Sequence, residues 1–213
     1  EVAAKAVAWA AFLNAGQVCT SSERIYVQRA IADRFLEALV NFTGTLRLGP
    51  GFEPSTDIGP LARDRYRLKV EEQVEEAKKM GAVVLAGGKR PEGFRKGYYY
   101  EPTVMINVSH SMKVMSEETF GPVAPVMIYH DFDEVIRYAQ GTPYGLGAVL
   151  FTHDALKAKT FFEEVRAGTI WINDPLTDND AGPFGGMKMS GMGRELGLEG
   201  LDEYMGTKHV HWD

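Results

Sequence analysis

Hydrophobic positions in the first part of the chain recur at spacings that predict short helices and strands. Residues 1–13 are rich in alanine and predict a helix, although no Ser, Thr, Asp or Asn precedes its first apolar residue. Residues 24–28 predict a strand, and apolar side chains every three or four positions predict a helix over 31–44. The chain therefore starts with a helix, a strand and a second helix.

Turn-forming and charged residues mark the middle of the chain. Glycine and proline between positions 48 and 60 predict a loop, and a helix is expected at 64–80, with Gly81 past its end. The many Glu and Lys side chains of this helix indicate a solvent-exposed face. Two short strands are expected after it, at 82–85 and 97–104.

The second half has the clearest pattern, in which three β-rich runs alternate with two helix-length segments. Asp131, with Glu134 three residues later, predicts the start of the first helix, and Asp154 predicts the start of the second. Parallel strands need a crossover of about a dozen residues, so this alternation predicts a parallel sheet. The expected fold class is α/β, a three-layer, mainly parallel open sheet flanked by helices, with strands at 123–129, 146–152 and 169–173.

Composition and charge exclude several classes of protein. The chain has 213 residues, of which 45% are hydrophobic, and its longest apolar stretch, 6–13, is far shorter than the roughly 20 residues that span a bilayer. The net charge is −6, and no run of Lys and Arg exceeds two residues. We therefore expect a cytoplasmic protein with no nucleic-acid partner and no membrane contact. No repeat or flexible linker divides the chain, which predicts one unit.

Cys19 is the only cysteine, so an internal disulfide and a thiolate-rich metal site are excluded. It lies in a small, polar, glycine-containing loop, residues 14–21. A lone cysteine is often an inert, buried, small apolar residue. In a turn, however, backbone N–H groups can point at a developing oxyanion, and the thiol can act as a nucleophile toward a carbonyl. Both interpretations stay open for Cys19.

A second group of candidate residues precedes the strand at 123–129. Glu117 and Glu118 could be metal ligands, a general base or solvated loop charges. A carboxylate also suits a ribose, because its oxygens can accept hydrogen bonds from both sugar hydroxyls. Phe120 could pack in the core or offer a flat apolar wall to a nicotinamide ring.

A third group is the glycine-rich segment 183–195. Gly191 and Gly193 suggest a dinucleotide fingerprint, but the next glycine, Gly197, comes one residue too late and no parallel βαβ unit surrounds it. We reject that interpretation. The five histidines do not form a ligand set, and no metal site is expected.

Together, these three segments resemble the aldehyde dehydrogenase superfamily, in the same order and over the whole chain. The matching motifs are 16–19, 117–123 and 183–195, with supporting matches at 56–61 and 144–146. The resemblance implies that residues 1–213 have the fold of the catalytic domain. In that family the dinucleotide-binding domain, the general-base glutamate and an oxyanion-hole asparagine precede the cysteine. Only a helix precedes Cys19 here, so we expect a chain cut from a longer enzyme, without that domain and inactive alone.

The resemblance also implies roles for individual residues. Cys19 is similar to the nucleophile that attacks an aldehyde and carries the thiohemiacetal and the thioester, with NAD or NADP as hydride acceptor and a carboxylic acid as product. Glu118 is similar to the residue that holds the nicotinamide ribose, and Phe120 to the ring beside the nicotinamide. Phe184 is similar to an aromatic residue of the substrate tunnel.

Substrate and assembly follow less directly from the resemblance. The segment 171–182 corresponds to the entrance loop, and its acidic residues could favour a hydroxylated or cationic aldehyde or could simply be solvated. Asp178 is the candidate substrate-binding residue among them. Family enzymes are commonly dimers or tetramers whose interface includes a C-terminal strand, and residues 207–212 resemble that strand. A homodimer or homotetramer is expected for the intact enzyme.

Three alternatives remain beside this function. The chain could be a cysteine-dependent esterase or acyltransferase that uses no cofactor. It could be a non-catalytic domain that kept the fold, with an unreactive Cys19. It could also stay within the family but transfer the acyl group to coenzyme A or phosphate instead of water.

Overall fold

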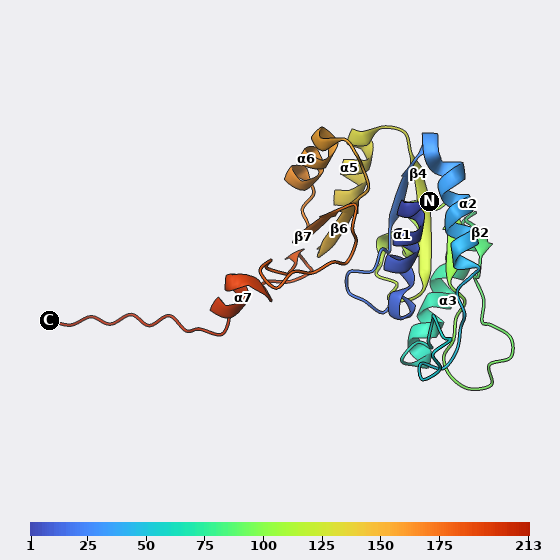
Figure 1. Cartoon of the computed structure of the whole chain (residues 1–213), viewed down its shortest axis with the longest axis horizontal. Helices are drawn as coiled ribbons and strands as arrows, with labels where there is room; N and C mark the ends of the chain where they lie inside the picture. The colour runs from blue at the N-terminus through green and yellow to red at the C-terminus, as the bar shows by residue number, and fades with distance from the viewer. The chain divides into compact units, whose positions relative to one another are not determined.

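The computed structural model describes residues 1–213, which divide into two compact units, Glu1–Val135 and Ile136–Asp213, called unit 1 and unit 2 below (Figure 1). The predicted fold class is confirmed: the chain is α/β, with a mainly parallel sheet flanked by helices. No helix combines the length and the apolar character needed to span a membrane.

Unit 1 is built on a four-stranded sheet. Its strand order is β1-β4-β3-β2, with β1 at Ile25–Gln28, β4 at Val123–Tyr129, β3 at Thr103–Ile106 and β2 at Val83–Ala86. The central strand β4 runs parallel to both β1 and β3, whereas β2 is antiparallel to β3 at the edge. Apolar side chains dominate β4, because strands pair with both of its edges and its first four residues are buried.

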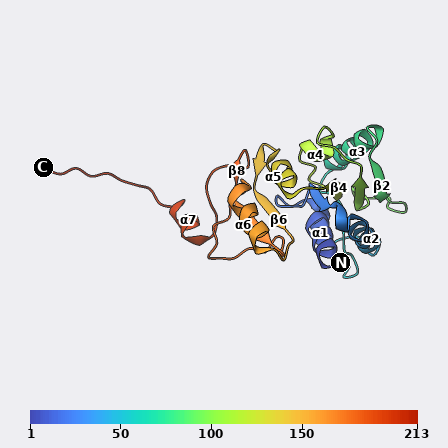
Figure 2. The same ribbon diagram turned by 90° about the horizontal axis from the view of Figure 1, so that it is seen from above.

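Helices cover both faces of this sheet, so that unit 1 has three layers (Figure 2). One face carries α1 (Val2–Phe12) and α2 (Ala32–Thr43), and the other carries α3 (Asp64–Lys79) and the short α4 (Lys113–Ser116). The alanines on the inner side of α1 are fully buried, and their small side chains allow α1 to approach its neighbours closely. As predicted, no side chain caps the start of α1. The core contains Ala4, Ala8, Phe12, Leu39, Val70, Val74, Met105 and Val126.

Unit 2 is smaller and contains two two-stranded sheets. The strands β6 (Gly147–Leu150) and β7 (Thr169–Ile172) are parallel and joined through α6 (Ala155–Glu164). The strands β5 (Tyr144–Gly145) and β8 (Met187–Lys188) are antiparallel. The remaining helices are α5 (Phe132–Gln140), which crosses the boundary between the units, and α7 (Gly197–Asp202).

The predicted helix starts at Asp131 and Asp154 are confirmed by hydrogen bonds. The Asp131 carboxylate accepts from the N–H groups of Asp133 and Glu134, at 2.9 and 3.2 Å. The Asp154 carboxylate accepts from the N–H groups of Leu156 and Lys157, at 2.9 and 3.1 Å. These bonds satisfy N–H groups that have no partner within the first turn of a helix.

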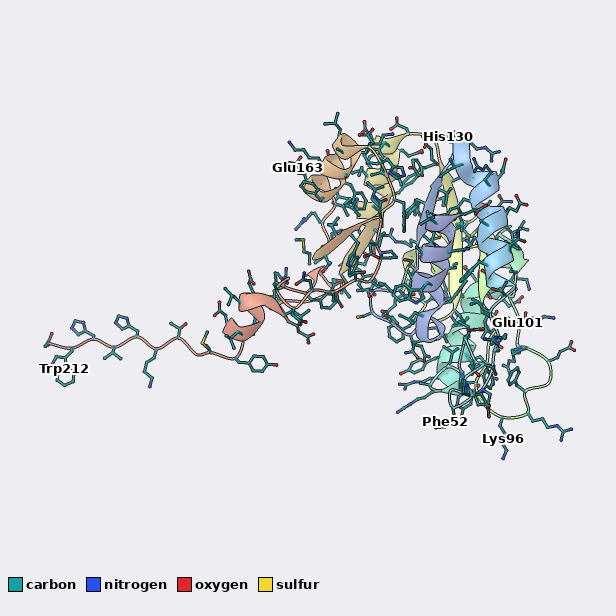
Figure 3. The ribbon with its side chains drawn as sticks, in the orientation of Figure 1. Phe52, Lys96, Glu101, His130, Glu163 and Trp212 are labelled. Atoms are coloured by element: carbon teal, nitrogen blue, oxygen red, sulfur yellow. The ribbon has the colours of Figure 1, made fainter.

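Three predictions about strands were wrong. The strand at 123–129 does not pair with the next one in sequence, because β1 and β3 occupy its two edges. The strand expected at 97–104 begins only at Thr103, since Tyr98 forms only an isolated bridge with Leu61 and Pro102 has no N–H to donate to a sheet. Residues 207–212 form no strand: this exposed segment makes no backbone hydrogen bond, and Trp212 projects from it at a distance from the helices and strands of unit 2 (Figure 3).

Candidate active site

The loop that carries Cys19 begins with an unusual turn. After α1, the 3₁₀ turn η1 (Leu13–Gly16) contains three successive residues with left-handed backbone angles: Asn14, Ala15 and Gly16 have φ of 51°, 57° and 73°. Only glycine adopts this conformation without a steric cost, so Ala15 stores backbone strain. Such strain persists only where the surrounding structure holds it, and it is concentrated at functional sites.

Side-chain hydrogen bonds hold this turn in place. Asn14 Nδ2 donates to the Gln17 carbonyl at 3.1 Å, and Gln17 Nε2 donates back to the Asn14 carbonyl at 3.0 Å. Gln17 Oε1 also accepts from the Ala62 N–H at 2.9 Å. On the other side of the cysteine, Ser21 Oγ donates to the Ala10 carbonyl at 3.2 Å. The loop is therefore tied both to α1 and to the segment before α3.

Cys19 itself is exposed in a tight turn, which the Ser21 N–H closes by donating to the Val18 carbonyl at 2.9 Å. The backbone N–H of Cys19 has no acceptor within the chain. The interpretation of Cys19 as a buried packing residue is wrong, because its side chain faces solvent. An exposed thiol and a free N–H on the same residue can serve as nucleophile and oxyanion donor.

The second candidate loop follows α4 in the same unit. Glu118 is exposed, and Phe120 is half-buried at a left-handed φ of 51°. Gln73, on the inner face of α3, reaches the Glu118 carbonyl with its Nε2 at 3.5 Å. The backbone of this loop is thus held against α3, while the carboxylate of Glu118 stays free to bind another molecule.

Unit 1 brings these two loops together through Glu23. The Oε2 atom of Glu23 accepts from the Thr119 N–H at 2.9 Å, and Oε1 accepts from the Phe120 N–H at 2.7 Å. The loops also touch at Gly16, where a Cβ would lie 2.1 Å from the Gly121 carbonyl oxygen. Only glycine fits there, which explains the small residue at the start of the cysteine motif.

Burial raises the pKa of the Glu23 carboxyl group above its ordinary value. The two N–H groups of Phe120 and Thr119 oppose this shift, and the nearby negative charge of Glu118 adds to it. Keeping a carboxylate at this position therefore costs free energy of desolvation.

Phe184 lies in unit 2, at the base of the glycine-rich segment. Its N–H donates to the Glu195 carbonyl, and the Glu195 N–H donates back, both at 2.7 Å. Inside this closed segment, Arg194 NH1 donates to the carbonyls of Gly186 and Gly193, at 3.0 and 2.7 Å. The glycines allow this close backbone packing, so the motif is a structural support for Phe184.

Asp178 is exposed in the loop that follows β7. The Trp171 indole N–H donates to the Thr177 carbonyl at 2.7 Å and so fixes the position of the preceding residue. Asp174 and Asp180 are exposed in the same loop. No three His, Cys, Asp or Glu side chains of the chain gather in a way that could hold a metal ion.

Sequence reasoning missed the residues that hold the site, above all Gln17 and Glu23. Gln17 belongs to the cysteine motif, and a polar side chain in a tight loop is a signal that it binds backbone groups. The Ala62 N–H that donates to Gln17 lies 45 residues away, and the two N–H groups that donate to Glu23 lie 96 and 97 residues away, so no local pattern identifies them.

Known proteins resemble this chain along its whole length. The model of the aldehyde dehydrogenase family matches residues 1–210. Betaine aldehyde dehydrogenase of Bacillus subtilis (strain 168) is 42% identical over 213 residues, which are 99% of this chain and 44% of that protein. A succinate-semialdehyde dehydrogenase (NADP+) of Mycobacterium leprae (strain TN) is 40% identical over 197 residues, 92% of this chain and 43% of that protein.

A solved structure gives the same result. The crystal structure of betaine aldehyde dehydrogenase from Staphylococcus aureus in complex with NAD+ matches with a TM-score of 0.94 and 39% sequence identity. The match covers 98% of this chain and 42% of that chain. This chain spans less than half the length of the relatives named here.

Proposed function

Because the chain belongs to the aldehyde dehydrogenase family, we propose that residues 1–213 are the catalytic domain of an NAD(P)-dependent enzyme that oxidises an aldehyde to a carboxylic acid. The dinucleotide-binding domain is, in this proposal, not part of the chain. One observation carries the assignment: the exposed thiol of Cys19 lies in a strained loop that Glu23 connects to the Glu118–Phe120 backbone.

The chain's own residues provide the nucleophile and part of the oxyanion site. The thiolate of Cys19 adds to the aldehyde carbonyl, and the carbonyl oxygen, now an oxyanion, accepts a hydrogen bond from the Cys19 N–H. A bound NAD or NADP would supply the hydride acceptor, and Glu118 and Phe120 would hold its ribose and its nicotinamide ring. The acyl group remains on Cys19 as a thioester, which water hydrolyses to the carboxylic acid and the free thiol.

Glu118 and Phe120 have the properties that the cofactor side requires. The exposed carboxylate of Glu118 can accept hydrogen bonds from both hydroxyls of a ribose. The half-buried ring of Phe120 presents an apolar face for a nicotinamide, and its backbone is fixed by the bond to Glu23. These residues therefore fit a nicotinamide nucleotide, with Glu118 as the ribose ligand.

In this proposal hydride transfer needs the dinucleotide-binding domain, and thioester hydrolysis needs a general base. Neither group is assigned to residues 1–213. We therefore expect no NAD-dependent turnover from the purified chain of 213 residues. Aldehyde-dependent formation of NADH by that chain, absent in Cys19→Ser, would contradict this part of the proposal.

The substrate we propose is a cationic or hydroxylated aldehyde. The relatives' names include both a betaine aldehyde and a succinate semialdehyde, whose charges are opposite, so the names alone do not choose. The exposed carboxylates of Asp174, Asp178 and Asp180 favour a positive charge in the entrance loop.

Asp178→Asn tests this preference in an active enzyme that contains the chain. Exposed charge pairs contribute little, so we expect the ratio of kcat/KM for a cationic over a neutral aldehyde to fall about 2- to 5-fold. An unchanged ratio would show that the loop is only solvated.

Assembly into a homodimer or homotetramer is also part of the proposal. Its support is the exposed apolar side chains of the C-terminal segment, Tyr204, Met205, Val210 and Trp212.

A cysteine-dependent esterase is the second candidate, favoured by the same exposed thiol. Such an enzyme needs a base beside Cys19, and the carboxylate nearest in sequence, Glu23, already accepts from two N–H groups.

Alkylation by iodoacetamide distinguishes both candidate enzymes from a non-catalytic domain with an unreactive Cys19. We expect Cys19 to react faster in the folded chain than in denaturant at the same pH. Ester hydrolysis without NAD, lost after alkylation, would favour the esterase.

A further inference from the structure

We propose that Glu23 is a positioning residue of the proposed reaction: its carboxylate holds the Thr119–Phe120 backbone against the Cys19 loop, so that the residues for the thiol and for the cofactor keep a fixed spacing. The inference rests on the proposed function, which assigns Glu118 and Phe120 to the cofactor. It adds a residue that touches neither the aldehyde nor the nucleotide.

The geometry of the contact is specific. Two successive backbone N–H groups, of Thr119 and Phe120, point at the two oxygens of one carboxylate, at 2.9 and 2.7 Å. The left-handed conformation of Phe120, at φ 51°, is of the kind that turns successive N–H groups toward one point. Such a concave pair of donors is suited to an anion with two acceptor atoms.

The position of Glu23 in the chain gives this contact its role. Glu23 lies four residues after Cys19 and two before Ile25, the first residue of β1, so its backbone belongs to the loop of the nucleophile. The bound N–H groups lie 96 and 97 residues away, directly after Glu118. One side chain thus connects the loop of the thiol to the loop of the proposed ribose ligand.

Stability alone does not call for a carboxylate here. Glu23 is half-buried, and its carboxyl group is withdrawn from solvent, which is costly for a charged group. Glutamine has the same size without that cost, but its Nε2 is a donor and cannot accept from a second N–H. The two N–H groups of the turn therefore favour a carboxylate over glutamine at position 23.

Glu23→Gln in the chain of 213 residues tests the contact directly. We expect hydrogen exchange at the Thr119 and Phe120 amides to accelerate about tenfold or more, since bonds to a charged acceptor are among the stronger ones. Exchange in β1 and β4, the melting temperature and the alkylation rate of Cys19 should stay unchanged. Glu37→Gln, an exposed carboxylate on α2, is the matched control and should change nothing.

The catalytic consequence is measured in an NAD-active enzyme that contains the chain. We expect Glu23→Gln to raise KM for NAD about tenfold with a smaller change in kcat. Glu23→Asp keeps the charge but has a shorter side chain, so its KM should lie between those of the unsubstituted enzyme and Glu23→Gln.

Unchanged exchange at Thr119 and Phe120, or faster exchange throughout unit 1, would overturn the proposal, because Glu23 would then be dispensable or merely stabilising. An unchanged KM for NAD would overturn it as well. Failure of the proposed function gives a different result, in which Cys19 is unreactive although the two amides still respond to Glu23→Gln.

Discussion

The two units of the chain hold their candidate site residues in different ways. Every one of the largest fully buried side chains belongs to unit 1, where they pack between the sheet and its helices. In unit 2 the most buried large side chains keep a small exposed area, with Ile136, Phe161 and Trp171 at 3%, 6% and 7%. Unit 1 has a closed core, whereas unit 2 is stabilised to a larger extent by backbone hydrogen bonds and close backbone packing.

The site loops reflect this difference. In unit 1, side chains such as Gln17 and Glu23 bind distant backbone groups and hold loops that a packed core supports. In unit 2, Phe184 is held by backbone pairs and by glycines that let strands and loops approach closely. Removing volume should therefore damage unit 1 most, and adding a methyl group should damage unit 2 most.

The largest effect is expected from a cavity in unit 1. Leu39 is fully buried on α2, and Leu39→Ala should lower the free energy of unfolding by about 3–5 kcal/mol, because the surrounding core relaxes only in part. Chemical denaturation measures this loss. Leu68→Ala, at a half-exposed position of α3, is the control and should cost much less. Equal losses in the two variants would mean that the core of unit 1 is not closed.

A methyl group at Gly168 makes the opposite test in unit 2. Its Cβ would lie 1.6 Å from the Gly185 carbonyl oxygen, so Gly168→Ala must displace the backbone that supports Phe184. We expect a loss of about 1–3 kcal/mol, the usual range for overpacking, and altered NMR signals for Phe184. Gly59→Ala, with no atom near the added carbon, is the control. A Gly168→Ala chain as stable as the control would contradict the backbone-based account of unit 2.

A smaller effect is expected at the start of α6. The Asp154 carboxylate accepts from two N–H groups of the first turn, and Asp154→Ala leaves them without a side-chain acceptor. The expected loss is about 1 kcal/mol, within the range for N-cap residues. Denaturation followed by circular dichroism measures it. A loss close to that of Leu39→Ala would mean that unit 2 has little stability beyond its helix starts.

The smallest effect is expected in unit 1 at an exposed ion pair. The Arg47 guanidinium and N–H lower the pKa of the Asp57 carboxyl group. A carboxyl pKa that is lowered in the folded state stabilises the fold at pH values above the ordinary carboxyl pKa. This stabilisation is lost as the pH falls through the lowered pKa. Asp57→Asn should therefore lower the melting temperature slightly at neutral pH and not at all in strongly acidic solution. A difference that persists in acid would assign the effect to another cause.

Local rules predicted much of the fold, because they depend on neighbouring residues. The bounds of β4 and the helix starts at Asp131 and Asp154 follow from nearby side chains and turn residues. The neighbours of β4 could not be predicted, because strand pairing depends on residues far apart in the sequence. Residues 207–212 have the composition of a strand but form no regular secondary structure in this chain.

The same limit applies to the candidate site. Cys19, Glu118 and Phe120 follow from motifs, and the turn before the cysteine is indicated by Gly16. Glu23 has no such signal: it stands between a polar loop and a strand, and its function depends on two N–H groups of another loop.

The central claim is that Cys19 adds to an aldehyde within a prepared loop. The most direct measurement is ¹³C NMR of the folded chain with an aldehyde labelled at the carbonyl carbon, compared with the denatured chain and with Cys19→Ser. Our account predicts a thiohemiacetal signal that is stronger for the folded chain than for the denatured one and absent in Cys19→Ser. Equal signals from folded and denatured protein, or no signal from either, would contradict it.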